Sequence, residues 1–182
     1  MNNNPIILKI KNAIIGTEFE NNTYIAGGFV RDMVMKKQSN DIDIVVSNNG
    51  LSGGINLSYL LYNTLNTSSP VTFPRFGTAQ IVIDNIDVEI VATRKESYNF
   101  IDRNPIVSEG TINDDVMRRD FTINALLYDI SNDKIIDLVN GIEDIKNGII
   151  RTTGKPDEIF AEDPLRILRA IRFHSQLGFK IE

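Results

Sequence analysis

Cysteine is absent from the sequence, and histidine occurs once, at His174. Without cysteine, the chain has no disulfide framework, no thiolate zinc site and no cysteine nucleophile. A single histidine also argues against a multi-histidine metal site and a serine triad, and we expect His174 to be a surface or packed residue. Any metal must therefore be held by carboxylates, whose oxygens suit Mg²⁺, Mn²⁺ or Ca²⁺.

Excess positive charge and long apolar runs are lacking as well. The 182 residues carry a net charge of −5, so the surface is not broadly basic, and an RNA partner would need a local basic patch or a part absent from this sequence. No apolar stretch approaches the length that crosses a membrane, so we expect no membrane partner and a cytoplasmic location. The balance of 42% hydrophobic and 24% charged residues is that of a globular protein with a sizeable core.

Apolar periodicity predicts a strand-rich first part and a helix-rich second part. We expect helices over 6–15, 29–36 and 55–65, and strands over 23–26, 41–46, 71–76, 78–83 and 86–91. The polar stretch 94–113 is predicted to be an irregular, functional or mobile loop. From Asp114 onward the pattern favours helices, with a small break around 134–138. The last helix is predicted to open at Asp163-Pro164, with Asp163 as its cap, and to end at Gly178.

Three acidic residues on two predicted strands form the first candidate site. Asp41 and Asp43 are two apart on a strand and share a face, while Ile42 and Ile44 point into the core. Glu89 repeats the aliphatic–acid–aliphatic pattern on a later strand and could sit beside them. Neighbouring carboxylates repel each other unless a cation lies between them. The alternative is a pair of solvent-facing acids on an edge strand.

A glycine pair between a strand and a helix forms the second candidate site. Gly27 and Gly28 would let the backbone approach a phosphate, and the helix that follows would supply unpaired N–H groups. Arg31 lies in the first turn of that helix, where its guanidinium could reach a triphosphate. A glycine pair alone usually means only a turn, and no Walker-type P-loop follows it. Together with the acids, however, the pattern favours nucleotidyl transfer assisted by two Mg²⁺ ions, with Mn²⁺ as an alternative.

These residues resemble the signature of polymerase-β-type nucleotidyltransferases. Segment 27–32 resembles the first motif of class II tRNA nucleotidyltransferases (CCA-adding enzymes) and of the related bacterial poly(A) polymerases, segment 118–125 their second motif, and segment 162–173 their neck motif. The resemblance covers residues 24–182. It implies an α+β fold with a polymerase-β-like head, a mixed or antiparallel sheet with flanking helices, followed by a helical neck. The implied division is a catalytic head over 1–137 and a nucleotide-selecting neck over 138–182, with the family's body and tail absent.

The resemblance also implies roles for individual residues. Asp41, Asp43 and Glu89 would be the catalytic metal ligands. Gly27, Gly28, Arg31 and Asn124 would bind nucleotide, Arg118 and Arg119 the triphosphate, and Asp120 the ribose 2′-OH. Asp163 and Arg166 would read the edge of the base, with acceptors from the carboxylate and donors from the guanidinium. Arg166, Arg169 and Arg172 recur every three residues and either meet phosphates or form a solvated face; Arg166 and Arg169 are the predicted nucleotide contacts.

The implied function is CCA addition, in which CMP and AMP pass from CTP and ATP to the 3′ end of tRNA. A poly(A) polymerase is one alternative, although Phe76-Gly77-Thr78 resembles the tRNA enzymes. Partial CC- or A-addition is another, and the 94–113 loop favours full CCA addition. A non-catalytic nucleotide- or RNA-binding module is the alternative from a different class.

Two features depart from the family pattern. Lys36-Lys37 occupies a region where relatives often carry glycine, which affects a turn rather than catalysis. The sequence stops at Glu182, just after the neck, so we expect either a catalytic fragment or a small enzyme that finds its RNA differently. With few basic residues available, we expect weak RNA affinity.

Overall fold

The computed structural model describes residues 4–99 and 102–182 of the chain. Its centre is a seven-stranded sheet in the order β3-β4-β5-β2-β1-β8-β9. Neighbouring strands are antiparallel except for β2 and β5, which are parallel. The strands are β1 (Thr23–Ala26), β2 (Ile42–Val46), β3 (Val71–Phe73), β4 (Thr78–Ile83), β5 (Ile86–Ala92), β8 (Leu127–Asp129) and β9 (Lys134–Ile136). The predicted α+β class with a mixed sheet is confirmed.

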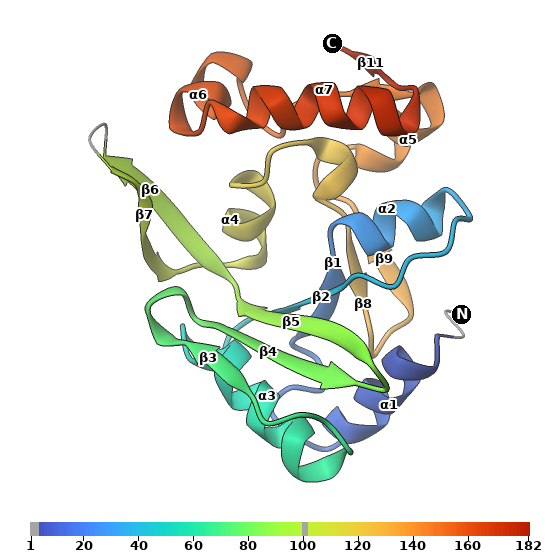
Figure 1. Cartoon of the computed structure of the whole chain (residues 1–182), viewed down its shortest axis with the longest axis vertical. Coiled ribbons are helices and arrows are strands. Elements are labelled where there is room, and N and C mark those ends of the chain that lie inside the picture. The colour runs from blue at the N-terminus through green and yellow to red at the C-terminus, as the bar shows by residue number, and fades with distance from the viewer. Residues whose placement is uncertain (1–3, 100–101) are drawn as a thin grey trace.

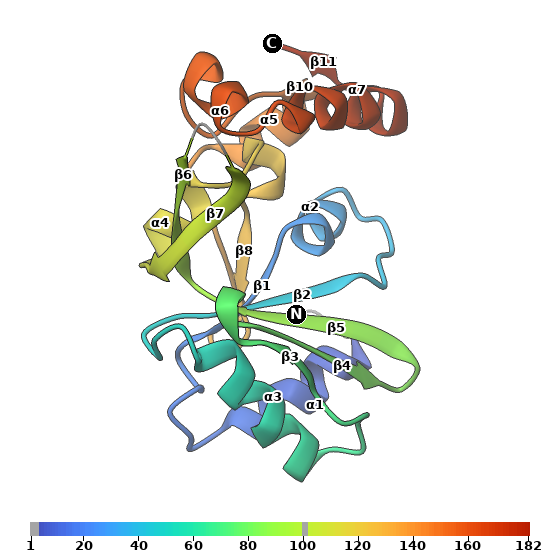
Figure 2. The ribbon, with the colours of Figure 1, turned by 60° about the vertical axis from the view of Figure 1, so that its left-hand side comes forward.

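Two helices, α1 (Pro5–Ile14) and α3 (Gly53–Thr64), cover one face of the sheet (Figures 1 and 2). Ile7, Ile10 and Ile14 recur at helical spacing on α1 and are buried, as is Leu57 of α3. The apolar side chains of β2 meet them in one core. Because side chains alternate along a strand, this core leaves the other face of β2 free to carry acids.

The opposite side of the sheet carries α2 (Gly28–Val34) and α4 (Ile112–Met117), and α5 (Gly141–Asn147) packs against α2 (Figure 2). The chain ends in α6 (Pro156–Glu162) and α7 (Leu165–Leu177), which lie together at the top of Figure 1. A two-residue parallel pair, β10 (Ile149–Ile150) and β11 (Lys180–Ile181), ties the C-terminus back to the segment after α5. Single 3₁₀ turns occur at Pro74–Phe76 and Thr122–Asn124. Within the described residues, no helix has the length and apolar character needed to span a membrane.

Most predicted elements occur within two residues of their expected bounds, but the predicted loop over 94–113 is wrong. Most of its described residues form an antiparallel hairpin, β6 (Arg94–Asn99) and β7 (Asp102–Glu109), which projects from the sheet in Figure 1. Residues 100 and 101 lie outside the described part. Polar side chains obscured the strands in sequence, because residues such as Arg94 and Glu96 of β6 are held by ion pairs and leave no alternating apolar pattern.

Strand β8 was also missed, since residues after 114 were expected to be mainly helical. Leu126 and Leu127 favour a helix by intrinsic propensity. Here they are completely buried, and β8 pairs with β1 on one side and β9 on the other. Tertiary pairing therefore overrides local preference. The sheet ends at β9, but α5 packs on α2 and on the 3₁₀ turn at 122–124, so the division at 137/138 stays a prediction.

Candidate active site

A cavity of about 690 Å³ lies between the acid-bearing face of the sheet and α7. Its volume is within the usual range for small-molecule sites. Every residue predicted for the site lines it: Gly27, Gly28, Arg31, Asp41, Asp43, Glu89, Arg118, Arg119, Asp120, Asn124, Asp163, Arg166 and Arg169. The fold therefore brings together three motifs that are widely separated in sequence.

Asp41, Asp43 and Glu89 form one side of the cavity, called here the acidic wall, which comes from the parallel strands β2 and β5. Asp43 and Glu89 are direct partners in the register of the two strands, and Ile42 pairs with Val88 in the same way. Ile42 and Val88 are buried, whereas Asp43 and Glu89 point to the cavity side. Asp41 directly precedes β2. Strand alternation and parallel register thus place the acids on one wall.

The electrostatic environment of Asp43 is unfavourable for a lone carboxylate. Burial, together with the negative charges of Asp41 and Glu89, raises the pKa of Asp43 from 3.8 to about 6, while Arg119 acts in the opposite direction. A bound cation would relieve this repulsion.

The three acids do not form a closed metal cage. Across residues 4–99 and 102–182, no group of three or more acidic or histidine side chains is arranged so that it could hold a metal ion. Mg²⁺, however, usually keeps several waters and takes one or two protein carboxylates together with substrate phosphates. The charge pattern around Asp43 fits that kind of site, and Glu89 as a third ligand remains a prediction.

Gly27 brings the backbone close to the charged groups. Its φ is +69°, and a Cβ at this position would lie 3.5 Å from both Asp43 Oδ2 and Arg119 Nη1. The backbone N–H of Gly27 donates to Leu126 O at 3.2 Å, which fixes the turn between β1 and α2. Glycine is favoured here because the left-handed conformation strains other residues.

Arg31 is held on several sides. Its Nη1 donates to Asn124 Oδ1 at 2.8 Å, its Nε donates to Asp32 Oδ1 at 2.9 Å, and its guanidinium lies 5.5 Å from the centre of the Phe173 ring. Arg31 therefore links the first motif, the second motif and α7. Asn124, predicted to bind nucleotide, also orients this arginine.

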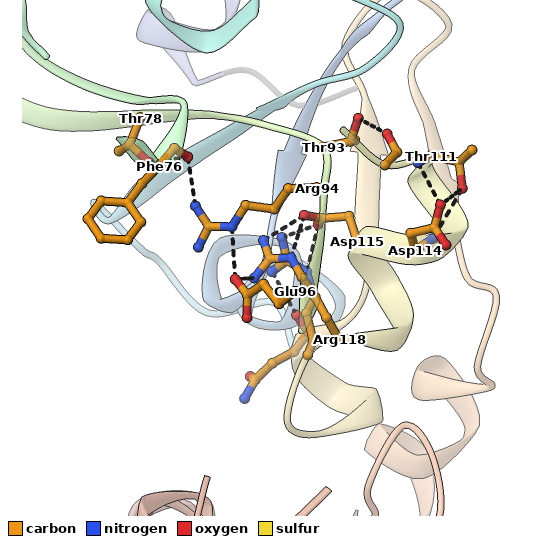
Figure 3. Close-up of polar contacts among 12 residues, drawn as sticks. Phe76, Thr78, Thr93, Arg94, Glu96, Thr111, Asp114, Asp115 and Arg118 are labelled. Atoms are coloured by element: carbon orange, nitrogen blue, oxygen red, sulfur yellow. Dashed lines mark hydrogen bonds and ion pairs between the residues drawn. The ribbon is translucent and has the colours of Figure 1, made fainter. Parts of the chain in front are cut away.

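Arg118 and Arg119 converge on Asp115, a residue that the sequence analysis did not single out. Asp115 is fully buried. It pairs with Arg118 at 2.6 Å (Figure 3) and with Arg119 at 2.9 Å. Burial raises the pKa of Asp115, but Arg119 and Arg118 outweigh that effect and leave the pKa lowered. The acid stands three and four residues before the arginines, a helical spacing that was visible in the sequence.

Asp120 joins the second motif to α7. Its Oδ2 accepts from Arg169 Nε at 2.6 Å, and its Oδ1 accepts from Phe121 N at 2.9 Å. The carboxylate is almost entirely buried, whereas the Arg169 side chain is about half exposed. Arg169 therefore contacts the residue predicted to bind the ribose.

Arg166 is much more buried than a base-reading arginine on a basic stripe would suggest. It is 6% exposed, its Nη1 donates to Ile159 O and Glu162 Oε2, and its Nη2 donates to Arg118 O at 3.0 Å. Asp163 precedes α7 by two residues and accepts from Leu165 N at 3.0 Å. The N-cap of α7 is Pro164, without a side-chain capping bond, so the prediction that Asp163 caps this helix is wrong by one residue.

The remaining residues of the neck divide between the cavity and the surface. Arg172 stacks over Phe173 at 5.1 Å, and both line the cavity. His174 is exposed, with Nδ1 2.6 Å from Phe179 O, as expected for a surface residue. The cavity walls also include Arg94 and Glu96 from the hairpin, which the sequence analysis had not assigned to the site.

Comparison with known proteins gives consistent matches. Residues 23–151 match the family model described as the poly A polymerase head domain. The chain is 39% identical over 180 residues to a CCA-adding enzyme of Ligilactobacillus salivarius, covering 98% of this chain and 41% of the relative. It is 36% identical over 161 residues to an A-adding tRNA nucleotidyltransferase of Aquifex aeolicus, covering 87% of this chain and 19% of that relative.

A solved structure agrees over nearly the whole chain. The Bacillus stearothermophilus CCA-adding enzyme in complex with CTP superposes with a TM-score of 0.78 at 28% identity, covering 98% of this chain and 41% of that one. This chain therefore spans well under half the length of these relatives.

Proposed function

Because the chain belongs to the poly(A) polymerase head-domain family, we propose that it transfers nucleotides from CTP and ATP to the 3′ end of tRNA, completing the CCA sequence. The observation that carries the proposal is the cavity in which an acidic wall, Asp41, Asp43 and Glu89, faces a set of arginines. An acidic wall suits a metal, and arginines suit the phosphates of the same ligand. The CCA-adding and A-adding names of the relatives support the choice of substrate.

The residues of the acidic wall would hold two Mg²⁺ ions, or Mn²⁺ in their place. Asp41 and Asp43 supply the principal ligands, with Glu89 as the third. When bound, the ions neutralise charge on the phosphates and activate the attacking hydroxyl. The raised pKa of Asp43 is consistent with a carboxylate that functions next to a cation.

The arginines bind and orient the triphosphate. Arg31, Arg118 and Arg119 all line the cavity, and forked guanidinium groups match phosphate oxygens. Each is braced by a carboxylate, Asp32 or Asp115, so that little side-chain freedom is lost when a nucleotide binds. Gly27 has no side chain, so the space between Asp43 and Arg119 remains free for a phosphate.

Sugar and base selection fall to the second and neck motifs. Asp120, held by Arg169, would accept a hydrogen bond from the ribose 2′-OH. Asp163 would offer acceptors to the base edge. Arg166 would act with it, either by turning a donor toward the base or by holding the start of α7 in place through its contact with Arg118 O. An enzyme with tRNA as acceptor is expected to work in the cytoplasm.

Incubation with Mg²⁺, labelled CTP or ATP, and tRNA lacking its 3′ end tests the proposal. Incorporation of both nucleotides into tRNA, and not into unstructured RNA, is the expected result. Failure of the folded protein to incorporate either nucleotide at high RNA concentration would support the binding-module alternative instead. A long tract of A on any RNA would support a poly(A) polymerase.

Addition of A alone is the second candidate, favoured by the A-adding relative. Both activities accept a tRNA that lacks only its terminal A, so this acceptor does not distinguish them. A tRNA that lacks all three nucleotides accepts label from CTP only if the enzyme adds C. This acceptor therefore separates the two candidates.

A further inference from the structure

We propose that Asp115 is a positioning residue for the triphosphate site: it fixes both arginines of the second motif in the direction that nucleotide phosphates require. The inference rests on the proposed function, because it assigns a triphosphate to the cavity that Arg118 and Arg119 line. Asp115 itself is completely buried, so its effect would be exerted through the arginines.

The hydrogen bonds of Asp115 are divided evenly between the two arginines. Oδ1 accepts from Nε and Nη2 of Arg118, at 2.9 and 2.6 Å. Oδ2 accepts from Nε and Nη2 of Arg119, at 3.2 and 2.9 Å. Each carboxylate oxygen therefore receives two donors of one guanidinium, an arrangement that sets the plane of each group as well as its position.

The remaining nitrogen of each arginine is directed toward other parts of the site. Nη1 of Arg118 donates to Glu96 Oε1 at 3.0 Å, and Glu96 also accepts from Arg94 on the same hairpin. Nη1 of Arg119 donates weakly to Asn124 O at 3.4 Å and lies next to Gly27. Figure 3 shows Arg94, Glu96, Asp115 and Arg118 as one connected group. A nucleotide that enters this cavity meets guanidinium groups whose orientation is already set.

Pre-organisation is the physical reason for the proposed effect. A free arginine loses rotamer entropy when it grips a phosphate, and that loss reduces affinity. A fully buried carboxylate that holds two arginines removes this cost before the ligand arrives. The negative charge of Asp115 also offsets the repulsion between the two guanidinium groups, since the carboxylate lies between them.

Asp114 provides a matched control on the same helix. Its carboxylate accepts from Thr111 N at 2.8 Å and from Thr111 Oγ1 at 2.7 Å, forming a capping box at the start of α4. It does not belong to the cavity-lining residues among those described. Asp114→Asn weakens α4 without removing an arginine contact, so it reports what a purely structural defect in this helix does.

The test compares the binding of CTP and CMP by calorimetry for the wild type, Asp115→Asn and Asp114→Asn. The readout is the ratio of the CMP and CTP dissociation constants, which measures the contribution of the β- and γ-phosphates. A loss of folded protein scales both ligands equally and leaves this ratio unchanged. We expect Asp115→Asn to lower the ratio about tenfold, roughly the effect of one charge-assisted hydrogen bond to phosphate, and Asp114→Asn to change it less than twofold.

A double-mutant cycle shows whether Asp115 acts through the arginines. In an Arg118→Ala/Arg119→Ala background, Asp115→Asn should cause no further loss of the ratio. A folded Asp115→Asn protein with an unchanged ratio would overturn the inference. If Asp115→Asn does not fold, Arg118→Lys replaces it: lysine keeps the charge but lacks the two-donor contact with Oδ1, and a ratio equal to that of the wild type would overturn the inference.

Failure of the proposed function gives a different result. In that case the wild type itself binds CTP no more tightly than CMP, and the variants have no triphosphate preference to lose. A wild-type preference for CTP that survives in Asp115→Asn rejects only the positioning role.

Discussion

Arg169 of α7 donates from Nε to Oδ2 of Asp120 across 2.6 Å, and this ion pair joins the last helix to the segment that carries Arg118 and Arg119. The two residues belong to different motifs, and nothing in their spacing along the chain indicated that they pair. The contact places an arginine of the neck motif on the carboxylate predicted to select ribose. Sugar selection in this protein is therefore expected to depend on α7.

Replacing Arg169 with Ala should weaken discrimination between CTP and dCTP. Asp120 would lose the contact that fixes its Oδ2, and a nearly buried carboxylate with one partner fewer should lower the free energy of unfolding by about 1 to 2 kcal/mol. Incorporation kinetics with both nucleotides and a thermal melt measure the two effects. Arg172→Ala is the control, since Arg172 lies on the same helix and stacks on Phe173. Equal discrimination in the wild type and Arg169→Ala would contradict the role of the pair.

Asp43→Asn should stabilise the metal-free protein at neutral pH. The folded-state pKa of about 6 lies above the ordinary value of 3.8, so the folded protein binds the proton more tightly than the unfolded chain. The contribution of the Asp43 carboxyl to the free energy of unfolding is therefore fully present below about pH 4, and it is lost as the pH rises through about 6. A shift of this size corresponds to at most about 3 kcal/mol, and solvent at the partly exposed carboxylate reduces it.

Denaturant melts in EDTA at pH 4 and pH 7.5 measure this effect. Asp43→Asn should gain about 1 to 2 kcal/mol over the wild type at pH 7.5 and close to nothing at pH 4. Asp87→Asn controls for the loss of one negative charge, since Asp87 is an exposed residue of β5. The same change for Asp43→Asn at both pH values would show that ionisation of Asp43, which burial and the charges of Asp41 and Glu89 oppose, is not the cause.

Mg²⁺ should raise the melting temperature of the wild type but not of Asp41→Ala. A ligand that binds only the folded state stabilises it by mass action, by about 2.7 kcal/mol at a hundredfold excess over its dissociation constant. Asp41 lies at the edge of β2 and is exposed, so its loss should leave the fold intact. Nucleotide incorporation by Asp41→Ala should fall by at least about a hundredfold. Retention of both the Mg²⁺ effect and activity would remove Asp41 from the metal site.

Gly27→Ala should reduce both stability and nucleotide binding. Its φ of +69° is strained for alanine, and its Cβ would lie 3.5 Å from Asp43 Oδ2 and Arg119 Nη1. With ψ at −134°, Gly27 lies in a sparsely populated region, and the backbone strain for alanine costs about 1 to 3 kcal/mol. Gly50 also has a positive φ, +64°, with nothing within 4 Å of its Cβ position, so Gly50→Ala shows the effect of alanine at a positive φ away from the cavity. A loss of CTP affinity in both variants would indicate a general folding defect rather than a local effect at the cavity.

The acidic wall shows how far local sequence information reaches. The alternation of Asp41, Ile42 and Asp43 predicted one buried and one polar face because side chains alternate along a strand whatever its neighbours are. The same argument predicted that Glu89 faces outward from its strand. Only the sheet decided that β2 and β5 are parallel neighbours with Asp43 and Glu89 in register, since pairing between distant segments depends on the packing of the whole core.

For the arginines, the sequence identified the residues of the site but not the groups that they contact. Motif resemblance identified Arg118, Arg119 and Arg166 as site residues, and all three line the cavity. Their partners were not predicted: Asp115 was overlooked, and Arg166 was expected on a basic stripe rather than buried against Arg118 O. The partners of a guanidinium group are the carboxylates and carbonyls that the fold brings within hydrogen-bond distance, and local sequence does not determine them.

The sequence by itself determined the residue types of the site, the alternating face that carries the acids, the glycine turn at Gly27-Gly28 and most of the helices and strands, because these depend on neighbours along the chain. The tertiary structure alone decided the hairpin β6–β7, the strand β8, the parallel register of β2 and β5, and the network around Asp115. Those features depend on contacts between segments far apart in sequence. The free energy of such contacts is not part of the local propensity of either segment.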